Sequence, residues 1–167
     1  MLTREQFLPH EMRIVAALRM QGASDEQVIV RVKSENLFQY PTERMVANRA
    51  TVCLRRLDAM VPTDAACAAR GIDPNTAVEA ALSLTGLIAS GTPTQTDQAI
   101  FYSMICRYDI VRELVLVEVG ERLQNFDYAF TAVDLNAFMT RFTTEYPDAA
   151  RWTEATVKRI KGSLRQT

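Results

Sequence analysis

The sequence predicts an all-α protein, a compact bundle of about seven or eight helices. Apolar residues recur at intervals of three and four along most of the chain, which is the period of an amphipathic helix. Capping residues, Gly and Pro divide these stretches and leave short connections between them. A length of 167 residues, with 48% hydrophobic and 23% charged residues, fits one soluble globular domain over 1–167. The alternative is two sub-lobes, 1–89 and 97–167, joined by a loop at 90–96.

The first two helices are joined by a tight turn. Residues 8–20 have apolar positions at helical spacing, and Gly22 ends that helix. Ser24 with Gln27 three residues later predicts a capping box, which opens a helix over 25–33. The outline resembles a helix-turn-helix, but a plain αα-hairpin that packs under the next helix is favoured.

The third helix is predicted to begin after Thr42, which caps it, and to run to about Met60 before Pro62. An Ala-rich turn is expected over 63–70. Asp73 then caps a further helix that extends through Ile88.

Pro74 fits the first turn of that further helix, which has few polar groups and is expected to be largely buried. The segment 90–96 is expected to be a loop.

The second half of the chain is expected to be mostly helical over 97–125. Residues 114–119 are rich in β-branched side chains, so a strand is conceivable there, although a helix is favoured. The stretch 126–133 fits either a loop or a strand. Asp134 is expected to cap the next helix, and Thr153 to open the last one.

Arginines on the third helix are the strongest functional signal. At about 100° per residue, Arg44 and Arg55 fall nearly in line, while Arg49 and Arg56 fall together about a third of a turn further round. The opposite side is apolar, as a core-facing side is. Guanidinium groups on one helix face favour binding of phosphate or carboxylate, so nucleic acid is the first expected ligand.

The last helix is a second basic element. Lys158, Lys161 and Arg165 share a face and Arg159 lies to one side of it. Complementing the negative end of the helix dipole is the more ordinary explanation for these cations.

Charge is unevenly distributed along the chain. Residues 1–60 carry a net charge of +2, residues 61–140 a net charge of −6 and residues 141–167 a net charge of +3. The ten acids of the middle segment offer a structural alternative, in which the arginines of the third helix are paired internally.

Motifs for catalysis are missing from the sequence. His10 is the sole histidine, and no phosphate-binding loop, serine-hydrolase motif or metal-ligand spacing occurs. We therefore expect no enzyme activity, no cofactor and no metal site. Cys53 and Cys106 have apolar neighbours and are expected to be buried thiols of a cytoplasmic protein, since no CxxC pair, signal peptide or membrane-spanning stretch is present.

Two aromatic residues precede the arginine helix. Phe38 and Tyr40 lie in the loop before Thr42. Tyr40 is a candidate for base stacking beside Arg44, but a hydrophobic staple that fixes the entry to the helix is favoured.

Three sequence blocks occur in the order that resembles the BrxA family: EMRIVAALRMQGASDE, NLFQYPTER with RRLD, and WTEATVKRIK. These blocks span nearly the whole chain, from Glu11 to Lys161. The family comprises small accessory proteins of the bacteriophage exclusion (BREX) defence systems of bacteria. It was once described as an inner-membrane family, which the hydropathy of this sequence contradicts, and was likened to the antitermination factor NusB.

The resemblance implies an all-helical protein without catalytic activity that binds double-stranded DNA with no marked sequence preference. It implies contacts from Arg44, Arg49, Arg55, Arg56, Lys158, Arg159 and Lys161. Two alternatives stay open: a protein–protein adaptor whose arginines bind an acidic defence component, and NusB-like RNA binding.

Overall fold

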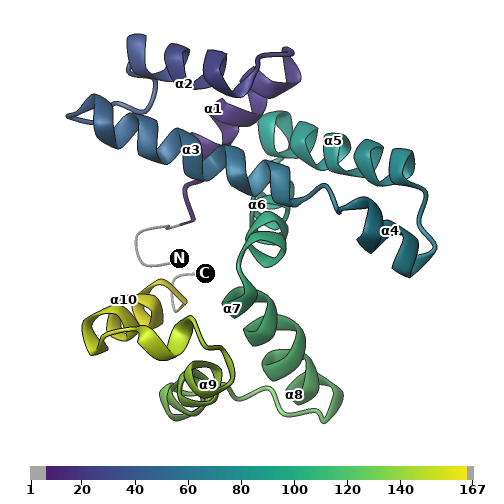
Figure 1. Ribbon diagram of the computed structural model, residues 1–167, viewed down its shortest axis with the longest axis vertical. Coiled ribbons are helices and arrows are strands. Elements are labelled where there is room, and N and C mark those ends of the chain that lie inside the picture. The colour runs from purple at the N-terminus through teal and green to yellow at the C-terminus, as the bar shows by residue number, and fades with distance from the viewer. Residues whose placement is uncertain (1–6, 165–167) are drawn as a thin grey trace. The chain divides into compact units, whose positions relative to one another are not determined.

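The computed structural model describes residues 7–164, and this part of the chain is built from helices with no β-strand (Figure 1). The all-α prediction is therefore confirmed. The chain divides into two compact units, an N-terminal unit of Leu8–Arg107 and a C-terminal unit that contains the chain from Tyr108 onwards. The division falls after Arg107, and the 90–96 segment lies inside the N-terminal unit.

The N-terminal unit is built around α1. This helix packs against α5, α6 and α3, and α2 also packs against α3, as expected for a hairpin beneath the arginine helix. The bounds of the six helices are α1 (Pro9–Met20), α2 (Asp25–Ser34), α3 (Glu43–Ala59), α4 (Asp64–Arg70), α5 (Pro74–Ser90) and α6 (Pro93–Arg107). Their core includes the fully or almost fully buried Met12, Val15, Val28, Val32, Val46, Ile88, Ile100 and Met104.

Two predicted helix starts are confirmed in detail. The Ser24 hydroxyl accepts a hydrogen bond from the backbone N–H of Gln27, whose side chain accepts one from the Ser24 N–H, so the capping box is complete. Thr42 accepts a hydrogen bond from the Met45 N–H at the start of α3. These bonds satisfy N–H groups that have no partner inside the helix.

Two other predictions for this unit are wrong. The 63–70 segment is not a turn but α4, capped by Thr63, because alanine is the strongest helix former. The segment 90–96 is not a loop throughout, since α6 begins at Pro93. Thr92 and Gln95 exchange the hydrogen bonds of a capping box across that proline.

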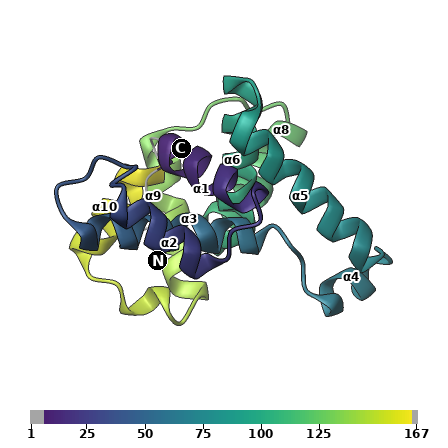
Figure 2. The same cartoon turned by 90° about the horizontal axis from the view of Figure 1, so that it is seen from above.

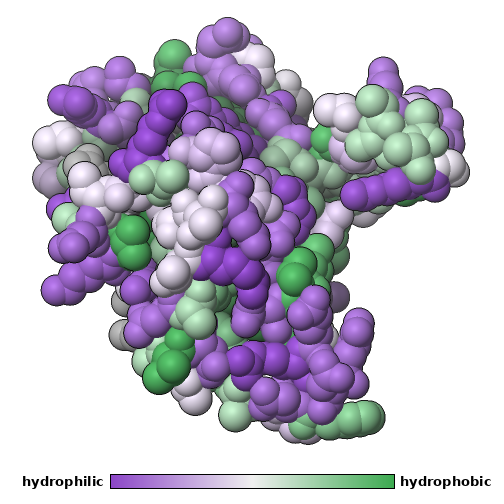
Figure 3. All heavy atoms as spheres, turned by 60° about the horizontal axis from the view of Figure 1, so that its bottom comes forward, coloured by the Kyte–Doolittle hydropathy of each residue, from purple (hydrophilic) through white to green (hydrophobic). Residues whose placement is uncertain are grey.

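Helix α5 is less buried than predicted. Its second half packs on α1 and α6, but α4 and the first half of α5 extend away from those helices in Figures 1 and 2. Val78 and Leu82 are consequently 42% and 55% exposed, although the helix as a whole is apolar. Figure 3 shows weakly hydrophobic residues grouped at this projecting end.

The C-terminal unit begins with a continuous helical run. The run consists of α7 (Asp109–Arg112), the π-helix η2 (Glu113–Val119) and α8 (Gly120–Gln124). The unit continues with α9 (Ala132–Glu145), the 3-10 helix η3 (Ala149–Arg151) and α10 (Glu154–Leu164). The β-branched 114–119 stretch is therefore helical, with the wider turns of a π-helix. Helix α9 packs against η3 and α10, and its cap is Thr131 rather than Asp134, which completes the capping box as the third helical residue.

An arginine holds the loop between α8 and α9. The guanidinium of Arg122 donates to Asp127 Oδ2 at 2.7 Å, to the Ala129 carbonyl at 2.9 Å and to Asp134 Oδ1 at 2.7 Å. Two aromatic side chains of this loop nevertheless face solvent, since Phe126 is 79% and Tyr128 74% exposed. The 126–133 stretch thus forms no strand. It is a loop that Arg122 holds by hydrogen bonds, and it leads into α9 at Ala132.

The cysteines are distributed differently from the prediction. Cys53 on α3 is buried as expected, whereas Cys67 on α4 is also buried and Cys106 is half-buried. Within residues 7–164, no helix is both long and apolar enough to cross a membrane.

Candidate nucleic-acid interface

Helix α3 presents a polar stripe opposite its buried side. The apolar residues of α3 pack toward α1, α2 and α6, and Ala50 and Cys53 on that side have no solvent exposure. Arg44, Asn48 and Arg55 lie nearly in line on the other side and are all exposed. The sequence therefore fixes this stripe through ordinary helical amphipathicity.

Arg44 and Arg55 are both available for a ligand. Neither side chain forms a hydrogen bond or an ion pair with any residue that the structure describes. Eleven residues separate them, which at 1.5 Å per residue places their Cα atoms about 16 Å apart along the helix. The stripe thus offers two separate cationic groups with a polar amide between them.

Arg49 and Arg56 do not belong to this stripe, which corrects the predicted four-arginine face. Arg56 has 0% exposure and Arg49 is half-buried, and neither side chain is without an interaction partner. The physical reason is their angular position: they are about 120–140° from Arg44, on the flank of the apolar side. In this conformation Arg56 cannot reach a phosphate.

Tyr40 is held by a buried carboxylate. Its hydroxyl donates a short hydrogen bond to Glu11 of α1, which is 7% exposed. This hydrogen bond, together with burial, raises the pKa of Tyr40, and the nearby Arg49 opposes the shift. Phe38 is 5% exposed and meets the Tyr40 ring edge to face at 6.3 Å between centroids. The loop before α3 is thus tied to α1 by this hydrogen bond, and the predicted staple contact of the two rings with α3 stays a prediction.

Helix α10 carries the second predicted basic surface, of which Arg165 lies outside the described residues. Ile160 is fully buried, while Lys158 and Arg159 are exposed and Lys161 is half-buried. No residue of the described chain forms an ion pair or a side-chain hydrogen bond with these three cations. As far as residues 7–164 are concerned, they are therefore free for an anionic ligand. This surface belongs to the C-terminal unit, whereas the α3 stripe belongs to the N-terminal unit.

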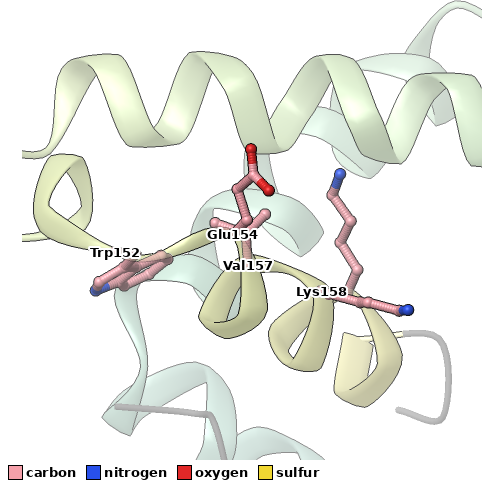
Figure 4. A pocket seen from close by; sticks show the side chains of 5 residues that line it. Trp152, Glu154, Val157 and Lys158 are labelled. Carbon is pink, nitrogen blue, oxygen red and sulfur yellow. The ribbon is translucent and has the colours of Figure 1, made fainter.

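Trp152 is a further candidate residue, which the sequence pattern did not indicate. It lies between η3 and α10 and lines a surface depression together with Lys158 and Lys161 (Figure 4). Its position in the sequence could have indicated it, because Trp152 lies between the last two predicted helices and next to the basic one. The apolar spacing of a helix core does not require an aromatic side chain there.

Groups for other chemistry are sparse. Among residues 7–164, no cluster of three or more His, Cys, Asp or Glu side chains is arranged to hold a metal ion. The buried carboxylate of Glu11 accepts the hydrogen bond from Tyr40. Asp134 belongs to a helix cap, and its pKa is lowered by hydrogen bonds from Thr131 and by Arg122. The titratable groups with shifted pKa values thus have structural partners.

These features define an all-α protein with two cationic surfaces, one on α3 and one on α10. The family model of BrxA matches residues 1–167, which is the whole chain, and the chain therefore belongs to the BrxA family. The family name associates it with BREX phage defence. No curated protein and no solved structure matches the chain.

Proposed function

We propose that this BrxA-family protein is a non-catalytic accessory protein of BREX phage defence that binds double-stranded DNA in the bacterial cytoplasm. The observation that carries the proposal is the pair of exposed guanidinium groups of Arg44 and Arg55 on one side of α3, which have no partner among residues 7–164. Arginine side chains that are not engaged within the protein are suited to bidentate contacts with phosphate oxygens. Phosphate contacts carry no sequence information, which agrees with binding that lacks marked sequence preference.

The contact set that we propose is smaller than the sequence alone indicates. It comprises Arg44 and Arg55 on α3, with Lys158, Arg159 and Lys161 on α10 as a second group. Arg49 and Arg56 are left out because they are engaged within the protein. A small number of phosphate contacts is also consistent with a net charge of −1 for the whole chain.

The experiment is a fluorescence anisotropy titration of labelled duplex DNA over a series of salt concentrations. The affinity should fall as salt rises, because each phosphate contact releases counterions. Replacing both stripe residues, Arg44→Ala with Arg55→Ala, should weaken binding and reduce the slope of log K against log salt by roughly 2, at about 0.9 per phosphate.

The matched control is Arg70→Ala combined with Arg31→Ala. These arginines are exposed like the stripe residues but lie on α4 and α2, so the variant loses the same charge from other surfaces. If the control weakens binding as much as the stripe variant does, the assignment of the interface to α3 is wrong.

Two competing functions give different results. An adaptor whose arginines bind an acidic protein gives no anisotropy change with duplex DNA at any salt concentration, but binds a purified BREX component with loss of affinity in the stripe variant. A NusB-like RNA-binding protein prefers single-stranded RNA to duplex DNA at equal salt. Either result would overturn the duplex proposal.

A further inference from the structure

A shallow depression of about 310 Å³ lies along one side of α10 (Figure 4). Four of its lining residues follow the spacing of one helix face, at intervals of three and four. They are Glu154, Val157, Lys158 and Lys161. Trp152, which precedes the helix, completes the lining, so the depression combines a flat aromatic surface with two ammonium groups.

The indole of Trp152 is fixed by an aromatic stack. Its ring stacks on Phe142 of α9 at 6.0 Å between centroids, and Phe142 stacks in turn on Tyr146 at 4.2 Å. Trp152 is only half-buried, so part of the indole still faces the depression. An aromatic ring that is already immobilised loses little conformational entropy when a second flat ring stacks on it.

The charged groups of the depression are not engaged elsewhere. Within the described chain, neither Lys158 nor Lys161 nor Glu154 forms an ion pair or a side-chain hydrogen bond. The lysines provide donors for an anion, and the carboxylate of Glu154 provides an acceptor for an amino group. A ligand that fits all three features has a flat ring, an amino group on that ring and an anionic group.

We propose that this depression binds an unpaired nucleotide, whose base stacks on Trp152 while its phosphates contact Lys158 and Lys161. The inference rests on the proposed function for its ligand class and refines it at one point. Lys158 and Lys161 contact the phosphates of an unpaired nucleotide, and the contacts to duplex DNA are then those of Arg44 and Arg55. A base inside a duplex is covered by its neighbours and cannot stack on an indole, whereas an unpaired base exposes its ring face. The amino group of cytosine or adenine then lies toward Glu154.

The size of the depression agrees with this assignment. About 310 Å³ lies at the lower end of the volumes of small-molecule sites, which suits one nucleotide. Contact with one base and its flanking phosphates needs no closed pocket, because single-strand binding proteins use open platforms.

Trp152 also provides the test, since it is the sole tryptophan of the chain. Stacking of a base on its indole should quench tryptophan fluorescence. The probes are short oligo(dC) and oligo(rC) strands, an abasic oligonucleotide of the same length, and a blunt duplex. We expect saturable quenching by oligo(dC) or oligo(rC). The strand that binds more tightly shows whether the nucleotide comes from DNA or from RNA. The abasic strand should not quench.

The variant Lys158→Gln with Lys161→Gln leaves the indole in place and keeps the reporter. It should weaken the binding of the oligonucleotide on the order of tenfold. It should also reduce the slope of log K against log salt by about 1.4, at roughly 0.7 for each phosphate of a single strand. Arg70→Gln with Arg31→Gln removes the same charge from α4 and α2 and should leave quenching unchanged. The variant Val157→Glu, which places a carboxylate inside the depression, should also weaken binding while circular dichroism reports an unchanged fold.

The results separate the two proposals. Absence of quenching by both oligonucleotides, or equal quenching by the abasic strand, overturns the nucleotide site, while the duplex anisotropy titration independently tests the α3 stripe. Quenching by oligonucleotides together with no duplex binding overturns the proposed function and retains the nucleotide site.

Discussion

The hydroxyl of Tyr40 donates a hydrogen bond to the buried carboxylate of Glu11, and this bond ties the loop that precedes α3 to α1. The loop also contains Asn36 and Gln39 with positive φ angles of 44° and 57°, so its path departs from ordinary extended backbone. The direction in which α3 leaves the loop, and with it the position of the arginine stripe, depends on this contact.

Removing the hydroxyl should destabilise the protein. Tyr40→Phe leaves a carboxylate that is 7% exposed without its hydrogen-bond donor, which should lower the free energy of unfolding by about 1–3 kcal/mol. Tyr128→Phe is the matched control, because Tyr128 is 74% exposed and its hydroxyl forms no hydrogen bond within the described residues. Urea titration of both variants measures the difference. Equal stability of the two would show that the Glu11 contact contributes nothing.

The same contact predicts a pH dependence. The hydrogen bond to Glu11 and burial raise the pKa of Tyr40 above the ordinary value of 10.0. The neutral phenol is thus favoured in the folded state, so this contribution to stability is fully present below pH 10.0 and is lost as pH rises through the folded-state pKa.

Urea titrations below and above pH 10.0 should therefore show that raising the pH lowers the free energy of unfolding less in Tyr40→Phe than in the unmodified protein. The raised pKa values of Tyr102 and Tyr146 leave a residual slope in both proteins. An identical slope in the two proteins would contradict the assignment to Tyr40.

Neighbouring arginines on α3 should behave in opposite ways. Arg56 has no solvent exposure, so Arg56→Ala removes a large buried side chain and should cost roughly 2–5 kcal/mol of stability. Arg55 is exposed and unpaired among the described residues, so Arg55→Ala should change stability by no more than about 0.5 kcal/mol. Thermal and urea unfolding of the two variants provide the comparison, and a stable Arg56→Ala protein would place that side chain at the surface.

The arginine clamp should protect the aromatic loop from proteolysis. Arg122→Ala removes the hydrogen bonds to Asp127, Ala129 and Asp134, so the loop that exposes Phe126 and Tyr128 should open more often. Chymotrypsin, which cuts after aromatic residues, should then cleave the 126–130 region several times faster, as followed by mass spectrometry. Arg112→Ala breaks an exposed ion pair with Asp109 elsewhere in the same unit and should leave the cleavage rate unchanged.

Local signals predicted most of the helices. The Ser24 and Thr42 caps marked two helix starts correctly, because capping depends on residues within one turn. The signals for α4 and for the start of α6 were also present, as a Thr cap before an Ala-rich run and as Pro93 within a Thr–Gln box. The two segments were wrongly predicted as a turn and a loop, because the helix preference of alanine and of proline in a first turn was not given enough weight.

The candidate site was less accessible to prediction from sequence. Helical spacing correctly placed Arg44 and Arg55 together, but the environment of Arg56 depends on which neighbouring elements cover the flank of α3. Trp152 lines the depression with Lys158 while its indole stacks on Phe142 of α9. Contacts of this kind join residues of different elements, and the period of a single helix does not encode them.

Cys53 and Cys67 give the N-terminal unit two internal probes of local opening. Both thiols are 1% exposed or less, so a thiol-reactive reagent can reach them only when α3 or α4 transiently separates from its neighbours. Helix α4 lies at the projecting end of the unit while α3 lies against its core, so the labelling of Cys67 should be faster than that of Cys53. The ratio of the two rates measures how independently the end that carries α4 fluctuates from the helix that carries the arginine stripe.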